Sequence, residues 1–379
     1  MEQQVIINAA IYPGGNEQPI EKGFLRFSEQ IIEVGNMEAY KEQEGEKVLD
    51  AGGRIVIPGM IDVHIHGGHG IDFMDADPEK TVELSHMLLG EGVTSFFATT
   101  MTQSHDRITE AMAAIKTAKE MGANIEGVHL EGPFINVNKA GAQYPEYICP
   151  PNIETFIKWY EASGEDIKLV TYAPELEGGR EFEKVMDERG IIPSVGHSDA
   201  VRAELLESSA SHATHLYNGM RGLHHREPGV AGHALLTEGL QVEIIADGVH
   251  IHPDMIDLAY RLKGAEGITL ISDAMRAKGI LEGESELGGQ KVFVSNGEAR
   301  LENGSLAGST LTMDKAFQNI IKFTGCSIAE AVQMTSGNQA REFRLEQKGL
   351  LQAGKDADFV IMNEELEVEN TYRMGISYK

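Results

Sequence analysis

The chain has few cysteines and no long apolar run. Its 379 residues include two cysteines, Cys149 and Cys326, which are too few for a disulfide framework and typical of a reducing cytosol. No apolar stretch approaches the roughly 20 residues of a membrane-spanning helix, and the N-terminus lacks the pattern of a secretory signal. We therefore expect a cytoplasmic protein with no membrane partner.

Positive charge is also scarce. Lysine and arginine total 32 against 59 aspartates and glutamates, which gives a formal net charge of −27. Nucleic-acid binding depends on lysine and arginine at the phosphates, so this balance argues against a nucleic-acid partner. It does not exclude a small phosphorylated ligand, because such a ligand needs only a few local donors.

Both ends of the chain have the pattern of short strands. Apolar runs at residues 5–7, 23–27 and 30–34 are separated by glycine, proline and asparagine turns, and a further run follows at 358–362. The simplest arrangement pairs the two ends in one small β-sandwich domain, formed by residues 1–54 and 345–379.

Residues 55–344 follow a different pattern, in which eight apolar runs alternate with stretches of helical period. Such alternation is typical of parallel strands connected by helices. Eight units predict an α/β fold, a closed TIM-like (β/α)8 barrel inserted into the β-sandwich. The runs are residues 55–66, 93–101, 125–131, 167–173, 191–197, 213–216, 242–247 and 268–273.

Metal-ligand residue types recur at the ends of five of these runs, where barrels carry their active sites. Singly, each has a structural explanation, such as a loop cap or a satisfied core histidine. Their repetition is hard to explain as packing, because ionisable groups at the ends of buried strands are costly unless they are paired or metal-bound. The residues are His64, His66, Glu131, His197, His215 and Asp273.

Their chemistry suits a divalent metal, Zn²⁺ or Fe²⁺, because imidazole and carboxylate are the preferred ligands of both. Three of them, Glu131, His197 and His215, make a site that leaves one position for water. Such a metal lowers the pKa of water to roughly 7, so hydroxide forms near neutral pH. The pattern therefore predicts metal-assisted hydrolysis, without naming the bond.

The pair His64 and His66 predicts a second metal position. Residues two apart in a strand point the same way, so both imidazoles share one face. Glu131 or Asp273 would then reach both ions. An aspartate beside the metal can also accept a proton from water and return it to a leaving group.

Several segments resemble a known family. The motifs VIPGMIDVHIHG at residues 56–67 and GKDADFV at 354–360 are similar to those of the amidohydrolase superfamily. More narrowly, the chain resembles the family of N-acetylglucosamine-6-phosphate deacetylases along essentially its whole length. The segments that carry this narrower resemblance are VHLEGPF at 128–134, GHSD at 196–199, ATHLYNGM at 213–220, REPG at 226–229, ADGVH at 246–250 and SDAM at 272–275.

The resemblance implies hydrolysis of N-acetylglucosamine 6-phosphate to glucosamine 6-phosphate and acetate. It implies that Glu131, His197 and His215 are the main metal ligands. It also implies that Asp273 is the catalytic aspartate. Some members lack the His-x-His pair and keep one metal. Since His64 and His66 are both present, one or two divalent ions per subunit are expected.

The resemblance further implies a set of residues that bind the phosphorylated amino sugar. Two of them, Arg226 and His250, match residues that meet the phosphate, in the family partly from the neighbouring subunit, which implies a homodimer. Gln143 stands where some members have a histidine near the scissile carbonyl, and an amide cannot carry charge. The full set is Ala142, Gln143, Asn218, Gly219, Arg226, His250, Leu306, Ala307 and Gly308.

Other interpretations compete with these. Arg226 is a candidate for a surface salt bridge, His250 for a core histidine at the barrel rim, and Asn218-Gly219 for a simple turn. The nearest rival function is another amidohydrolase, such as a cyclic amidase or a deaminase. Many two-metal cyclic amidases bridge their metals with a carbamylated lysine, and Glu131 at that position counts against them. A rival function of another class is that of a non-catalytic metal-binding or scaffold protein. The six ligand-type residues are all present, which argues against this rival.

Overall fold

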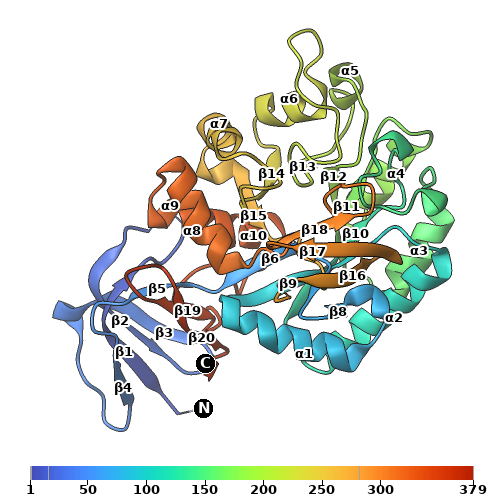
Figure 1. The fold of residues 1–379 in the computed structure, drawn as a ribbon. Coiled ribbons are helices and arrows are strands. Elements are labelled where there is room, and N and C mark those ends of the chain that lie inside the picture. Colours follow the sequence, from blue (N-terminus) through green and yellow to red (C-terminus); the bar gives the residue numbers. More distant parts are fainter. Residues whose placement is uncertain (1, 16, 281, 379) are drawn as a thin grey trace. The chain divides into compact units, whose positions relative to one another are not determined.

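The computed structural model describes residues 2–15, 17–280 and 282–378. Strands from both ends of the chain pair in one eight-stranded sheet, in the order β21-β20-β19-β5-β1-β2-β3, with β4 also paired to β1. Blue and dark red strands adjoin in this sheet (Figure 1). Its strands are β1 (Gln4–Ile11), β2 (Ile20–Phe27), β3 (Ile31–Asn36), β4 (Lys47–Asp50), β5 (Ile55–Pro58), β19 (Phe359–Met362), β20 (Val368–Arg373) and β21 (Ile376–Tyr378).

Residues from opposite ends of the chain share the core of this sheet. β5 runs antiparallel to β19, with Pro58 opposite Phe359. The ring of Phe27 lies edge-on to those of Phe359 and Tyr372, with centroids 5.0 and 5.4 Å apart. Edge-to-face aromatic pairs stabilise a core beyond the area that they bury. The predicted pairing of the two chain ends is thereby confirmed.

A buried ion pair also belongs to this part of the chain. Arg26, 2% exposed, donates from Nε to Glu46 Oε2 over 2.8 Å. The Tyr40 hydroxyl donates to Glu46 Oε1 over 3.0 Å. The hydrogen bond from Arg26 outweighs the effect of burial and lowers the pKa of the Glu46 carboxyl to about 2. A buried guanidinium is tolerated here because carboxylate and carbonyl oxygens accept its hydrogens.

Seven of the predicted apolar runs and the second half of the first run form the second sheet, in the order β15-β14-β13-β12-β11-β10-β9-β6. The first run, predicted as one strand over residues 55–66, divides at Gly59, because residues 55–58 form β5 of the first sheet and residues 60–65 form β6. The pairs from β9 to β15 are parallel. A parallel bridge between Ile65 and Ala274 brings the two edges of the sheet together, which confirms the predicted barrel. The strands are β6 (Met60–Ile65), β9 (Val93–Thr100), β10 (Ile125–Glu131), β11 (Ile167–Tyr172), β12 (Ile192–Val195), β13 (His212–Ala213), β14 (Gln241–Ile245) and β15 (Ile268–Ile271).

The helices up to Lys263 connect these strands, as the alternating pattern predicted, and those from Met313 onward follow the last strand of the barrel. Helix α2 shows why such helices form. Ser104 caps it by accepting the backbone N–H of Arg107, and its buried residues Ile108, Ala111, Ile115 recur at helical spacing. No helix within the described ranges is both long and apolar enough for a membrane span. The helices are α1 (Pro78–Leu88), α2 (His105–Glu120), α3 (Ile153–Ala162), α4 (Gly179–Asp187), α5 (Arg202–Leu205), α6 (Gly229–Leu236), α7 (Pro253–Lys263), α8 (Met313–Thr324), α9 (Ile328–Val332) and α10 (Asn338–Glu342).

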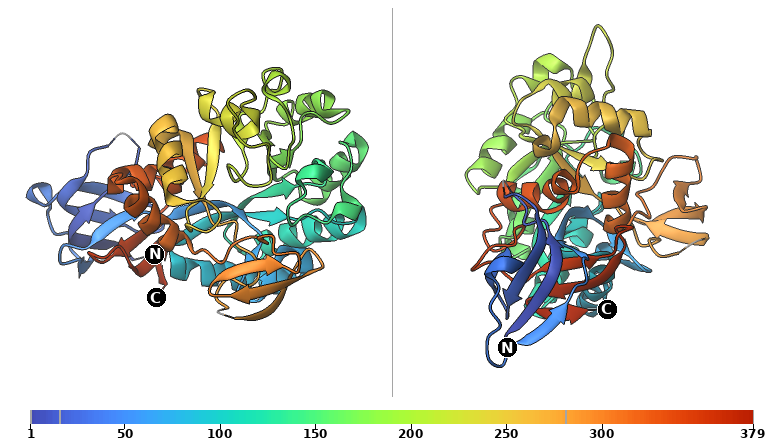
Figure 2. Two further views of the ribbon diagram at one scale, coloured as in Figure 1. Left: turned by 45° about the horizontal axis from the view of Figure 1, so that its top comes forward. Right: turned by 90° about the vertical axis from the view of Figure 1, so that its left-hand side faces the viewer.

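A third, three-stranded antiparallel sheet follows β15. It consists of β16 (Gly283–Leu287), β17 (Gln290–Ser295) and β18 (Glu298–Leu301), with a turn at Asn296-Gly297. In the right-hand view of Figure 2 these strands form a separate small orange layer. The short strands β7 (Gly67–Gly68) and β8 (Ile71–Asp72) pair in a hairpin after β6.

By compactness the chain divides into two units. One comprises the residues up to Asp62, His86–Ser95 and the chain from Met313 onward, and the other comprises Val63–Ser85 and Phe96–Thr312. Every candidate site residue named above lies in the second unit. The domain boundaries expected from the sequence, 54/55 and 344/345, stay a prediction.

Candidate active site

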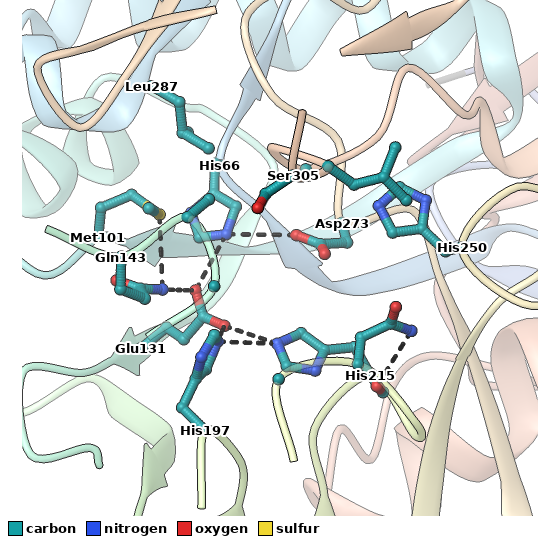
Figure 3. A pocket seen from close by; sticks show the side chains of 16 residues that line it. His66, Met101, Glu131, Gln143, His197, His215, His250, Asp273, Leu287 and Ser305 are labelled. Carbon is teal, nitrogen blue, oxygen red and sulfur yellow. Dashed lines mark hydrogen bonds and ion pairs between the residues drawn. The ribbon is translucent and has the colours of Figure 1, made fainter. Parts of the chain in front are cut away.

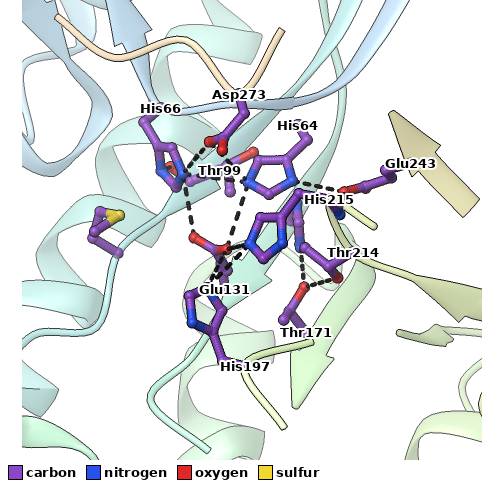
Figure 4. Close-up of polar contacts among 12 residues, drawn as sticks. His64, His66, Thr99, Glu131, Thr171, His197, Thr214, His215, Glu243 and Asp273 are labelled. Atoms are coloured by element: carbon purple, nitrogen blue, oxygen red, sulfur yellow. Dashed lines mark hydrogen bonds and ion pairs between the residues drawn. The ribbon is translucent and has the colours of Figure 1, made fainter. Parts of the chain in front are cut away.

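Side chains from five strand ends meet at the C-terminal end of the barrel (Figure 4). His64 lies in β6 and His66 just after it, β10 ends in the third, and the others stand two residues after the ends of β12, β13 and β15. All six are buried, so their charges and lone pairs face one another rather than solvent. They are His64, His66, Glu131, His197, His215 and Asp273, and the structure brings together all of the predicted ligand types.

Three of them form the first candidate metal group. The Nε2 atoms of His197 and His215 each lie 3.1 Å from Glu131 Oε1 and 3.1 Å from each other. The other nitrogen of His197, Nδ1, lies 2.7 Å from the carbonyl oxygen of Lys139. A carbonyl only accepts, so Nδ1 carries the hydrogen, and Nε2 of the neutral ring points a lone pair at the other ligands. This arrangement fits a cation.

The second group consists of His64, His66 and Asp273. The two Nε2 atoms are 3.3 Å apart, and each lies 3.4 Å from Asp273 Oδ1. His66 Nδ1 faces the carbonyl oxygen of Thr99 at 3.2 Å, which again leaves Nε2 as the free ligand atom. Glu131 lies between the groups, because its Oε2 is 3.2 Å from His66 Nε2. The predicted bridging position of Glu131 is therefore compatible with the geometry.

The electrostatics of the cluster favour positive charge. Burial lowers the pKa of His66, but hydrogen bonds to Asp273 and Glu131 outweigh burial and raise this pKa to about 9. Burial raises the pKa of Glu131, yet the charge of His64 and the contacts with the other histidines hold it well below its ordinary value. A divalent ion would satisfy the same carboxylates, so the donor set fits a metal in chemistry as well as geometry.

The backbone is strained where the ligands leave the strands. His197, His215 and Asp273 have φ values of 46°, 30° and 48°. Non-glycine residues rarely adopt this left-handed region, and such strain persists only where the surroundings impose it. The chain therefore turns sharply at three of the six side chains and points them toward one another.

The cluster lies at the floor of a cavity of about 320 Å³ (Figure 3). Seven of the predicted substrate-binding residues line it: Ala142, Gln143, Asn218, Gly219, His250, Leu306 and Gly308. Ala307 is fully buried beside them, and its N–H donates to Ala299 O over 2.9 Å. Arg226 is the exception, because it lies in an exposed loop outside this lining, with Nη1 2.8 Å from His225 Nε2.

His250 faces the cavity from the loop after β14. Its Nδ1 lies 2.6 Å from Asp247 Oδ2, and its backbone N–H donates to Asp247 Oδ1 over 2.8 Å. Burial lowers the pKa of His250, but the hydrogen bond to Asp247 outweighs burial and raises it. The ring is thus fixed in place, and the raised pKa of His250 suits an anionic group in the cavity.

Sequence reasoning missed four lining residues and one buried carboxylate. Met101 ends the predicted run at 93–101, and Gly141 and Ser305 adjoin the predicted residues Ala142 and Leu306. Leu287 ends the strand β16, and no local pattern marks it. Glu243 is different, because it stands inside an apolar run, at a position of β14 that is fully buried. An acidic residue in a buried strand needs partners, and that conflict is a signal the sequence does contain.

Comparisons with known proteins show the family of the chain. The profile of the amidohydrolase family matches residues 55–376. N-acetylglucosamine-6-phosphate deacetylases from Lysinibacillus sphaericus and Bacillus subtilis are 45% and 42% identical, over 88% and 94% of this chain and 87% and 92% of theirs. An N-acetylgalactosamine-6-phosphate deacetylase from Escherichia coli O157:H7 is 34% identical over 86% of this chain and 89% of its own.

Two solved structures resemble the whole chain. An N-acetylglucosamine-6-phosphate deacetylase from Thermotoga maritima aligns with a TM-score of 0.89 at 33% identity, covering 99% of both chains. A mutant deacetylase from Mycobacterium smegmatis, in complex with N-acetyl-D-glucosamine 6-phosphate, aligns with a TM-score of 0.93 at 28% identity and covers 100% of both chains.

Proposed function

Since the chain belongs to the amidohydrolase family, we propose that it hydrolyses the N-acetyl group of N-acetylglucosamine 6-phosphate to give glucosamine 6-phosphate and acetate. One observation carries the proposal: the two metal-ligand groups, the second of which includes Asp273, meet at the floor of a cavity that is also lined by His250. Its volume, about 320 Å³, is within the range of small-molecule sites. Relatives at 45% and 42% identity carry the name of this activity.

The enzyme is metal-dependent, as its family is, and we assign the metal to the two groups described above. Glu131, His197 and His215 would hold one ion, Zn²⁺ or Fe²⁺. His64 and His66 would hold a second. A divalent ion there supplies a Lewis acid for the acetyl carbonyl and lowers the pKa of water.

Asp273 is the proton carrier in this proposal. Its carboxylate borders the cavity and is 8% exposed, so substrate and water can reach it. It takes a proton from the water that attacks the acetyl carbon. It then returns this proton to the sugar nitrogen as the C–N bond breaks, which releases acetate and the free amine. One aspartate thus serves as base and then as acid.

The remaining lining residues bind the sugar. Asn218 lines the cavity, and its Oδ1 suits a sugar hydroxyl, because its Nδ2 already faces backbone carbonyls. Gln143 lines the cavity beside the sugar, with its amide engaged by Glu131 and Thr102. His250, whose pKa is raised by its hydrogen bond to Asp247, meets the phosphate. Arg226 lies on an exposed loop outside its own cavity, and we propose that it reaches the phosphate of a neighbouring subunit in a homodimer. The cytoplasmic location and the domain boundaries given above belong to the same proposal.

A second substrate is supported by the relative that is named for the galactosamine epimer. Acetate release should therefore be measured with N-acetylglucosamine 6-phosphate, its galactosamine epimer and unphosphorylated N-acetylglucosamine. We expect the first to give the highest kcat/KM and the unphosphorylated sugar the lowest. A higher kcat/KM for the galactosamine epimer would make that sugar the assigned substrate. Equal kcat/KM for the unphosphorylated sugar would contradict phosphate binding by His250 and Arg226.

A further inference from the structure

Glu243 contacts one residue in each of the two metal-ligand groups, although it does not line the cavity. It lies in the middle of β14 and is fully buried. Its Oε2 is 2.9 Å from His64 Nδ1, and the same oxygen accepts the backbone N–H of His215 over 2.9 Å. Its Oε1 is 3.2 Å from His212 Nε2. Figure 4 shows its contact with His64 on the side away from Asp273.

The contact with His64 decides which nitrogen of that ring binds a metal. An ionised carboxylate only accepts, so the hydrogen of the neutral imidazole lies on Nδ1. The lone pair is then on Nε2, which faces His66 and Asp273 at 3.3 and 3.4 Å. His66 and His197 are oriented in the same way, but by the neutral carbonyls of Thr99 and Lys139. Of these three orienting partners, only Glu243 carries charge.

The contact with His215 acts through the backbone. No described residue hydrogen-bonds to the buried Nδ1 of His215, so its ring is not fixed from that side. Its backbone is strained, with φ of 30°. The hydrogen bond from its N–H to Glu243 holds this strained residue where Nε2 meets Glu131.

We propose that Glu243 is a positioning residue that prepares His64 and His215 for metal binding and so raises the metal affinity of the site. The inference rests on the metal groups of the proposed function, but not on its substrate. Groups that orient metal ligands typically change metal affinity by roughly 10- to 100-fold when they are replaced. Glu243 orients one ligand in each group, so we expect its replacement to weaken whichever ion the protein binds.

A purely structural role for Glu243 is the alternative, and Glu183 provides the matched control. Glu183 is also a buried carboxylate in the same unit, 5% exposed, and accepts hydrogen bonds from the hydroxyls of Tyr172 and Ser208. It has no contact with the six ligand residues among its described partners. If burial of a carboxylate were all that mattered, Glu243→Gln and Glu183→Gln would have the same effects.

The test measures metal binding rather than turnover. Metal-free wild type, Glu243→Gln and Glu183→Gln are titrated with Zn²⁺ in competition with a chromogenic chelator, and the visible spectra of their Co²⁺ forms are recorded. We expect Glu243→Gln to bind Zn²⁺ roughly 10- to 100-fold more weakly and to change the Co²⁺ spectrum, with Glu183→Gln like the wild type. Wild-type affinity and spectrum in a folded Glu243→Gln protein would overturn the proposal.

A second variant keeps the test decisive if Glu243→Gln does not fold. Glu243→Asp keeps the charge but shortens the side chain, which withdraws the oxygen that contacts both His64 and His215. We expect weaker metal binding again, and wild-type affinity would overturn the proposal. The metal titration contains no substrate, so its result does not depend on the proposed reaction. If the wild type binds metal but releases no acetate in the separate activity assay, only the proposed reaction is refuted. A wild type that binds no divalent metal would refute the metal groups and this proposal together.

Discussion

The amide of Gln143 joins the loop after β10 to the metal-ligand cluster through Glu131. Its Nε2 donates to Glu131 Oε2 over 2.6 Å, while its Oε1 accepts the backbone N–H of Thr102 over 2.8 Å. The second contact fixes which end of the amide faces the carboxylate. Glu131 is therefore held from one side by a neutral donor, while its other oxygen, Oε1, faces His197 and His215.

Replacing Gln143 by Leu should reduce activity without unfolding the protein. A hydrogen bond to a charged group contributes about 1.5–3 kcal/mol, which corresponds to about a 10- to 100-fold loss in kcat/KM. Steady-state kinetics with N-acetylglucosamine 6-phosphate measure it. Gln103→Leu is the control, since the Gln103 amide contacts Gly288 and not the ligands. Equal activity of both variants would show that the contact with Glu131 is dispensable.

His250 should control the preference for the phosphorylated sugar. We expect His250→Asn to lower kcat/KM for N-acetylglucosamine 6-phosphate about 10-fold or more, and to leave that for the unphosphorylated sugar nearly unchanged. The ratio of the two values is the measurement. His252→Asn is the control, because His252 is exposed and caps α7. An unchanged ratio in His250→Asn would assign the phosphate to other residues.

Arg226 is predicted to act on the neighbouring subunit, and mixed dimers can show it. An Arg226→Ala subunit keeps the catalytic Asp273 in its cavity. An Asp273→Asn subunit keeps Arg226, which it would supply to the cavity of its partner. After subunit exchange, the mixture should be more active than the sum of the two variants, because one site of each mixed dimer is complete. Exchange is followed with differently tagged subunits. Confirmed exchange without a gain in activity, or a monomeric protein in sedimentation, would contradict the shared site.

The Arg26–Glu46 pair predicts loss of stability in acid. The pKa of Glu46 falls from 4.5 to about 2 in the folded state, so the unfolded chain binds more protons between these values. The stabilisation is present above about pH 4.5 and is lost as pH falls toward 2, a contribution of about 2–3 kcal/mol. Urea unfolding at several pH values should show a smaller acid slope for Glu46→Gln than for the wild type. Glu44 is exposed, so Glu44→Gln is the control and should keep the wild-type dependence of the unfolding free energy on pH. The same dependence in Glu46→Gln would contradict the stabilising role of the Arg26–Glu46 pair.

The sequence predicted those parts of the site that follow from strand geometry. Six ligand-type residues were predicted because each stands at the end of an apolar run, and parallel strands bring such ends together. The loops could not be predicted in this way. Leu287, at the end of β16, and Ser305, in the loop after β18, reach the cavity through chain paths that no periodicity specifies. The two-residue strand β13 is shorter than the run expected at 213–216, because the chain turns at His215.

Two further residues show where sequence reasoning fell short. The resemblance places Arg226 at the phosphate, but within one subunit it lies outside the cavity lining, and its reach into a partner subunit stays a proposal. Glu243 lies within an apolar run and is not among the predicted site residues, although a buried acidic residue requires partners. Assigning those partners needs the structure, since His64 and His215 are distant from it in sequence.

The most direct test of the account is the activity of Asp273→Asn at matched metal content. Because one carboxylate makes both proton transfers, its loss should lower kcat for acetate release from N-acetylglucosamine 6-phosphate by about 10²–10⁴-fold. Metal analysis should still find an ion on the protein, since Glu131, His197 and His215 remain. A protein that keeps its metal and releases acetate at a near wild-type rate would contradict the proposed chemistry of this site.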